Sequence, residues 1–189
     1  MAGPLLRVEG LTVRFGGLVA VNDVHFTVDD GELLGIIGPN GAGKTTMFNA
    51  VAGAVRPTSG TIRIGDELVS GKPPERVARL GIARTFQSVR LFKAMTVAEN
   101  VTLSASTVCP SMAAARARAD EVAELLGMTA LQQIRVEELP LADQKKVEIA
   151  RALALRPKLL LLDEMMSGLN QSETRDIIGV IKQLNGDGL

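Results

Sequence analysis

The first third of the chain shows two patterns of apolar positions. Residues 8–15 and 24–28 alternate apolar with polar side chains, a period of two that predicts strands with one solvated face. Residues 33–37 are continuously apolar and lead into Gly38 and Pro39, which is typical of a strand buried on both faces. We therefore expect a small antiparallel layer followed by a buried strand.

The rest of the chain alternates strand and helix patterns. Between positions 88 and 139 the composition is typical of helices, and we interpret this stretch as a helical insertion. Asn185 and Gly186 form a stop signal for the last helix. Strands are predicted at 61–64 and 157–163, and helices at 44–52, 113–126 and 172–184.

The amino-acid composition mainly excludes classes of protein. The 189 residues carry 21 Lys and Arg against 21 Asp and Glu, which excludes a polybasic or polyacidic tail. A hydrophobic fraction of 46% predicts a folded chain. The single cysteine, Cys109, cannot form an internal disulfide, and the N-terminus lacks a signal-peptide pattern. We therefore expect a cytoplasmic protein.

Residues 38–45 match the phosphate-binding pattern GxxxxGK[ST] between a predicted strand and a predicted helix. The glycines let backbone N–H groups surround phosphate oxygens, and a helix N-terminus favours an anion. Lys44 would reach the β- and γ-phosphates and Thr45 would bind Mg²⁺. A chance glycine turn is the alternative. The predicted nucleotide-binding residues are Gly38, Pro39, Asn40, Gly41, Ala42, Gly43, Lys44, Thr45 and Thr46.

Asp163 and Glu164 follow the apolar run at residues 159–162. A strand delivers side chains to its carboxyl end, where sites on parallel sheets lie. We therefore predict that Asp163 supports Mg²⁺ and that Glu164 orients or deprotonates the attacking water. An ordinary loop start is the alternative for an acidic pair taken alone.

In this order the motifs resemble the ATP-binding subunit of ABC transporters. The resemblance runs from about position 5 to the end, through the phosphate loop, Gln87, a helical segment, residues 139–144, the acidic pair and residues 167–170. Residues 15–21, 83–87 and 91–100 are similar to the branched-chain amino acid importer group.

The resemblance implies an α/β fold. It has a P-loop NTPase core with a mainly parallel sheet, a small N-terminal antiparallel β layer and an inserted α-helical subdomain. Residues 1–87 would form the β layer and the phosphate-loop part of the RecA-like core, and residues 88–139 the helical subdomain. Residues 140–189 would form the signature helix, the Walker B strand and the following helix.

The resemblance also implies further site residues. Phe15 takes the place of the aromatic residue that stacks on adenine; a strand-end core residue is the alternative. Gln87 would bind Mg²⁺ and water while sensing the membrane partner. The implied D-loop is Ser167, Gly168, Leu169 and Asn170.

The signature that contacts the opposing subunit's γ-phosphate is degenerate. The family's LSGGQ becomes Leu139, Pro140, Leu141, Ala142 and Asp143, followed by Gln144. Pro140 has neither hydroxyl nor N–H, and Asp143 adds a carboxylate near an anion. The change affects the partner's nucleotide, so we expect an asymmetric, head-to-tail heterodimer. A helix from Pro140 to Leu153 is still expected because proline fits a first turn.

The resemblance places a γ-phosphate-contacting histidine beyond the last predicted helix, whereas the only histidine here is His25. His25 lies on a predicted edge strand, where a structural role is expected. We expect Leu189 to end a fragment of a longer protein, without the C-terminal part of the core.

The predicted function is an ATP-hydrolysing importer subunit that uses ATP and Mg²⁺ at the cytoplasmic face of the inner membrane. Its predicted partners are a second ATPase subunit, transmembrane permease subunits and, indirectly, a solute-binding protein, with no nucleic acid. Two alternatives stay open: a non-transport ABC ATPase, and a module that binds nucleotide with weak turnover.

Overall fold

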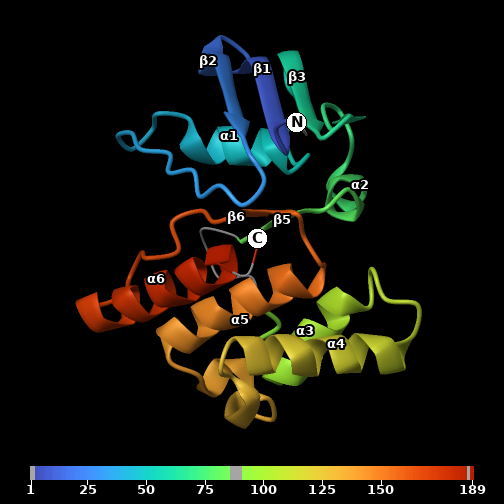
Figure 1. Cartoon of the computed structure of the whole chain (residues 1–189). Helices are drawn as coiled ribbons and strands as arrows, with labels where there is room; N and C mark the ends of the chain where they lie inside the picture. The colour runs from blue at the N-terminus through green and yellow to red at the C-terminus, as the bar shows by residue number, and fades with distance from the viewer. Residues whose placement is uncertain (1–2, 86–90, 187) are drawn as a thin grey trace. The chain divides into compact units, whose positions relative to one another are not determined.

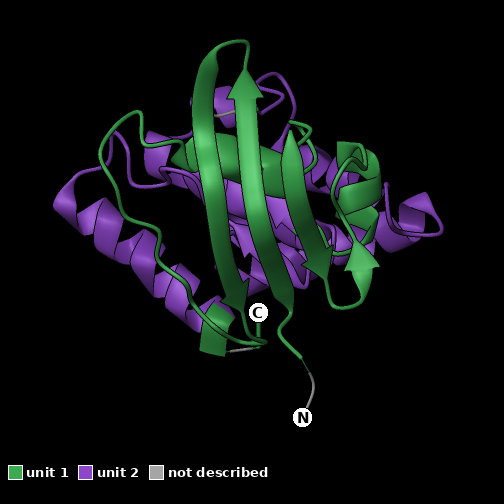
Figure 2. Cartoon of the chain, turned by 90° about the horizontal axis from the view of Figure 1, so that it is seen from above, with its two compact units in different colours: residues 1–82, 185–189 green, residues 83–184 purple. Residues whose placement is uncertain are grey.

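The computed structural model describes residues 3–85, 91–186 and 188–189. It divides into two compact units, which Figure 2 colours separately. The first unit is Met1–Ile82 with Asn185–Leu189, and the second is Ala83–Leu184.

The first unit is built on an antiparallel sheet with the strand order β2-β1-β3-β4. Every second residue at the start of β1 is buried, as the alternation predicts, and Leu11, Val13 and Ile62 extend this core. The helix α1 lies across one face of the sheet (Figures 1 and 2). The elements are β1 (Leu6–Phe15), β2 (Leu18–Val28), α1 (Lys44–Val51), β3 (Ser59–Ile64), β4 (Glu67–Leu68) and α2 (Pro74–Arg79). The predicted antiparallel layer is confirmed.

The buried strand predicted at residues 33–37 is wrong. Residues 32–39 form neither helix nor strand, and Leu33 and Leu34 are exposed. The side chain of Ile37 is 98% exposed. A strand buried on both faces needs hydrogen-bonded neighbours as well as apolar side chains. No strand in the described residues pairs with this segment.

The second unit contains the helical segment. The helix α3 packs on both α4 and α5 (Figure 1). Val97, Val101 and Ala105 are buried along α3 at intervals of four residues, the spacing of one helix face. The helices are α3 (Val97–Ala105), α4 (Met112–Leu125), α5 (Leu141–Ala154) and α6 (Gln171–Gly186), with short 3-10 turns at Thr129–Leu131 and Val136–Glu138.

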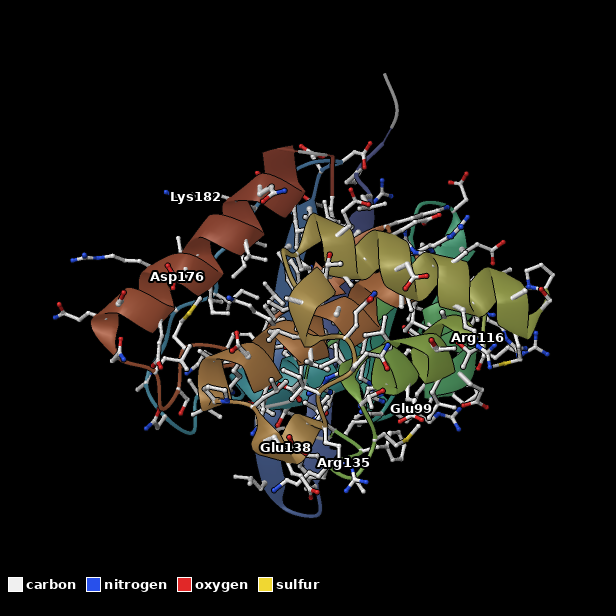
Figure 3. The ribbon with its side chains drawn as sticks, turned by 90° about the horizontal axis from the view of Figure 1, so that it is seen from below. Glu99, Arg116, Arg135, Glu138, Asp176 and Lys182 are labelled. Atoms are coloured by element: carbon white, nitrogen blue, oxygen red, sulfur yellow. The ribbon has the colours of Figure 1, made fainter. Side chains whose placement is uncertain are left out.

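Two short strands, β5 (Ile82–Arg84) and β6 (Leu159–Leu161), pair with each other. The helices predicted at 113–126 and 172–184 correspond to α4 and α6, and α6 continues through the expected stop signal to Gly186. Along α6, Ile177 and Leu184 are buried, whereas Asp176 and Lys182 are exposed (Figure 3). The charged residues therefore occupy the solvated side of this amphipathic helix.

Candidate nucleotide-binding site

The phosphate loop leads into α1 in the first unit. Gly41 and Gly43 have φ angles of 82° and 84°, a left-handed conformation that glycine adopts without steric cost. Gly43 is the N-cap of α1 and carries no side chain there, so the first turn keeps its N–H groups open to an anion. The Lys44 ammonium donates to the carbonyls of Gly38, at 2.6 Å, and Pro39, at 2.9 Å. The carbonyl groups of the loop therefore hold the Lys44 ammonium over the loop.

Phe15 ends β1 and pairs with Leu18 across the turn at Gly16 and Gly17. Its side chain is 51% exposed. The alternative interpretation, a strand-end core residue, is therefore wrong for Phe15. An exposed phenyl face can stack on a planar ring.

His25 lies on β2, an edge strand of the sheet. Its Nδ1 accepts a hydrogen bond from the Gly10 N–H at 3.2 Å, and its Nε2 lies 3.0 Å from Asp23 Oδ1. These local contacts agree with the structural role expected from the sequence.

The acidic pair follows β6 in the second unit, and its two carboxylates differ in environment. Asp163 is buried, while Glu164 is exposed and has a left-handed backbone with φ of 48°. The Asp163 N–H donates to Thr85 Oγ1 at 3.3 Å, and the Thr85 N–H donates to the Leu161 carbonyl at 2.9 Å. Buried Thr85 therefore fixes the backbone on which Asp163 is presented.

The Asp163 carboxylate fits a divalent cation. Its buried Oδ2 accepts no hydrogen bond from any described residue, and Mg²⁺ prefers carboxylate and hydroxyl oxygens. No group of three His, Cys, Asp or Glu side chains gathers as a metal site anywhere in the described ranges, including around Asp163. A site with one carboxylate suits Mg²⁺, which commonly uses one or two carboxylates together with phosphate oxygens.

The residues of the implied signature lie at the start of α5. Pro140 is the N-cap and provides no side-chain cap. Asp143 lies in the first turn, where its carboxylate is 3.5 Å from the Lys146 ammonium. Gln144 turns back and donates to the Leu139 carbonyl at 2.9 Å. A carboxylate of this chain thus occupies the end of the helix that favours negative charge.

The residues of the implied D-loop form the turn between Glu164 and α6. The Ser167 N–H donates to the Glu164 carbonyl at 3.1 Å. The Asn170 side chain accepts from the N–H groups of Ser172 and Glu173, at 2.9 and 3.0 Å. Asn170 therefore caps α6, a role that sequence analysis missed although Asn followed three residues later by Glu is a helix-start pattern. Gln87 lies outside the described residues.

A cluster of partly buried charges next to the acidic pair was also missed. A hollow of about 120 Å³ lies between β5, α3 and α5, with Arg84, Ser104, Glu148 and Arg151 among its lining residues. Burial lowers the pKa of Arg151 below its usual value, while the charge of Glu148 acts in the opposite direction. The Arg151 guanidinium donates to Ser104 at 3.1 Å and lies 5.3 Å from the centre of the Phe92 ring. Helical periodicity alone gives no signal for such a cluster.

The sequence matches the family described as ABC transporter over residues 21–167. The chain belongs to the ABC transporter family. It is 41% identical over 199 aligned residues to LivG of Escherichia coli K12, a high-affinity branched-chain amino acid transport ATP-binding protein. This alignment covers 97% of the chain and 78% of LivG. BraF of Pseudomonas aeruginosa, described in the same words, is 40% identical, with 99% and 79% coverage.

Solved structures of ATP-binding cassettes share the fold of this ABC ATPase. A nucleotide-free ATP-binding cassette from an ABC transporter superposes with a TM-score of 0.90 at 28% identity, covering 99% of this chain and 79% of that one. The ADP conformation of the cassette MJ1267 also superposes at 0.90, with 29% identity and the same coverage. The mixed α/β fold expected from the sequence, with an antiparallel N-terminal layer, is confirmed.

A dimeric cassette, MJ0796, bound to ADP and phosphate after hydrolysis, superposes with a TM-score of 0.83 at 26% identity, covering 96% and 83%. ATP hydrolysis is thus the chemistry of this family. Among the described helices, none combines the length and the apolar composition needed to cross a membrane.

Proposed function

We propose that this chain is the ATP-binding and ATP-hydrolysing subunit of an importer whose cargo is branched-chain amino acids. The observation that supports the cargo is the 41% identity to LivG over 97% of the chain. The phosphate loop, with Lys44 held over it by the carbonyls of Gly38 and Pro39, supports nucleotide binding.

In this proposal the first unit binds the nucleotide. The open N–H groups at the start of α1 donate hydrogen bonds to phosphate oxygens, and Lys44 exchanges its loop carbonyls for the β- and γ-phosphates. Exposed Phe15 stacks on the adenine. The nucleotide-binding set is Phe15, Gly38, Pro39, Asn40, Gly41, Ala42, Gly43, Lys44, Thr45 and Thr46.

Mg²⁺ would be held by Thr45, Gln87 and Asp163, whose side-chain oxygens suit this cation. When bound, Mg²⁺ supplies positive charge to the phosphate oxygens. Buried Asp163 remains a fixed ligand, whereas exposed Glu164 orients the attacking water and accepts its proton. The different burial of these two carboxylates supports this division of roles.

A first experiment replaces Glu164 by Gln, which keeps the side-chain shape but removes the base. With a partner ATPase and permease reconstituted, we expect turnover to fall about a hundredfold or more, because a general base contributes about 10²–10⁴-fold. Nucleotide affinity should remain. Glu138→Gln, at an exposed carboxylate of the same unit (Figure 3), is the matched control and should retain turnover. Native turnover in Glu164→Gln would reject the assigned role.

The proposed assembly is a head-to-tail pair with a second, different ATPase subunit, docked on permease subunits at the cytoplasmic face of the inner membrane. A solute-binding protein would deliver the cargo. The position of Asp143 in the first turn of α5 supports an asymmetric pair, because this end offers a carboxylate where the partner's γ-phosphate would lie. Restoring the signature with Pro140→Ser and Leu141→Gly should raise turnover of the reconstituted pair, and unchanged turnover would count against a weakened second site.

The same observation favours a second candidate, a subunit that binds nucleotide but turns it over weakly. Mg-ATP binding by the native chain without hydrolysis beside a partner of intact signature would select this candidate. Hydrolysis that depends on Glu164 would select the importer ATPase.

A further inference from the structure

We propose that Arg84 is a positioning residue for Asp163 and sets the affinity of the cation site. The inference rests on the proposed function, in which Asp163 is a cation ligand. The two residues are 79 positions apart in the sequence, yet Arg84 Nη2 lies 3.7 Å from Asp163 Oδ2.

Both partners are withdrawn from water. The side chain of Arg84 is 10% exposed and that of Asp163 is 4% exposed. A carboxylate this deeply buried requires a compensating charge, because desolvation strongly disfavours an isolated ion. Arg84 provides a positive charge that the structure places against this carboxylate.

The geometry leaves the carboxylate available. At 3.7 Å the ion pair is longer than a hydrogen bond, and Asp163 Oδ2 has no hydrogen-bond partner among the described residues. The Arg84 Nε–H instead donates to the Thr85 carbonyl at 3.2 Å, so the guanidinium is anchored to its own strand. Arg84 therefore compensates the charge of Asp163 without occupying the oxygen that a cation needs.

Two consequences follow. Without a cation, Arg84 stabilises the fold by compensating a buried charge. With a cation, the same guanidinium is a like charge next to the site and weakens binding. A neutral side chain at position 84 should therefore lower stability and tighten cation binding. A purely structural arginine predicts loss of stability with no gain in affinity.

The test is a titration of the full chain with Mn²⁺ in the presence of one equivalent of a non-hydrolysable ATP analogue. Free Mn²⁺ is measured by electron paramagnetic resonance, and thermal unfolding is followed without metal. In Arg84→Gln we expect Mn²⁺ to bind about tenfold more tightly, because a neighbouring positive charge is removed, while the melting temperature falls. Unchanged or weaker Mn²⁺ binding overturns the proposal.

Arg151→Gln is the matched control. It removes a second arginine from the same hollow, whereas the ion pair with Asp163 is made by Arg84. Its Mn²⁺ affinity should stay within about threefold of the native value, because the ion pair of Arg84 with Asp163 is kept. Arg84→Lys keeps the charge and should also stay near the native affinity. Equal tightening in Arg84→Gln and Arg151→Gln would overturn a specific role for Arg84.

Two variants at Asp163 complete the design. If Arg84→Gln does not fold, the double variant Arg84→Gln with Asp163→Asn removes both charges and should recover the folded state; failure to recover it overturns the pairing. Asp163→Asn alone should weaken Mn²⁺ binding. If it does not, the proposed function's cation site fails. If it does while Arg84→Gln changes nothing, only the inference about Arg84 fails.

Discussion

The substitution Gly43→Ala tests how the backbone path of the phosphate loop is fixed. Gly43 has φ of 84°, and a Cβ atom there would overlap the backbone oxygen of Ala20 on β2 and lie 3.4 Å from Val21 Cγ2. Gly41 has nearly the same conformation, with φ of 82°, but a Cβ atom there would meet nothing within 4 Å. The two glycines therefore separate conformational strain from contact with β2.

The expected losses differ accordingly. A left-handed alanine costs about 1–2 kcal/mol, and this is the whole effect expected for Gly41→Ala. Overpacking adds about 1–3 kcal/mol, so Gly43→Ala should lose roughly 2–5 kcal/mol of unfolding free energy. The added Cβ must push the start of α1 away from β2, because a backbone oxygen cannot rotate aside.

Equilibrium urea unfolding followed by circular dichroism measures both variants. Circular dichroism is the suitable probe because the chain contains no Trp or Tyr. Equal losses in Gly41→Ala and Gly43→Ala would refute the reasoning, since contact with β2 would then contribute nothing.

Three further predictions concern the helical unit, each measured by the same urea unfolding. Thr96→Ala removes the capping box of α3 and should lower the unfolding free energy by about 1 kcal/mol, whereas Thr96→Ser should keep the capping box. Equal losses of stability in the two variants would argue against a role of the cap. Asn100→Leu should lower the unfolding free energy by about 2–4 kcal/mol. Buried Asn100 accepts a hydrogen bond from the Phe92 N–H and donates to the Phe92 and Thr96 carbonyls, each at 3.0 Å. A loss below about 1 kcal/mol, the typical value for a single hydrogen bond, would contradict a stabilising role for these three bonds. Arg118→Met removes a 2.8 Å hydrogen bond from α4 to the Leu153 carbonyl on α5 and should lower the unfolding free energy by about 1.5–3 kcal/mol. Its control, Arg116→Met at an exposed position, should change stability by less than about 0.5 kcal/mol. Similar losses in the two variants would rule out a stabilising role for this hydrogen bond.

Local sequence patterns predicted the local structure well. The alternation at residues 8–15 and 24–28 corresponds to the β1-β2 hairpin, and Gly41 and Gly43 adopt the left-handed conformations that a phosphate loop uses. In each case neighbouring residues decide the outcome, by side-chain alternation or by backbone freedom.

Sequence patterns failed where the outcome depends on distant partners. The apolar run at residues 33–37 has the composition of a buried strand, but strand formation needs neighbours that composition cannot specify. Likewise, the ion pair of Arg84 with Asp163 joins positions 79 residues apart, and no local sequence pattern predicts it. Asn170 has a different explanation: its capping contacts are local, but its helix-start pattern lies within the segment that the family resemblance implies as the D-loop.

The most direct test of the central claim is calorimetric titration of the native chain and of Lys44→Ala with ATP and Mg²⁺. Lys44 is the residue through which the phosphate loop would recognise the β- and γ-phosphates. We predict saturable binding at one site in the native chain and its loss in Lys44→Ala, with both proteins equally folded by circular dichroism. Absence of ATP binding by the folded native chain, or equal binding by Lys44→Ala, would contradict the assignment of this loop as the nucleotide site.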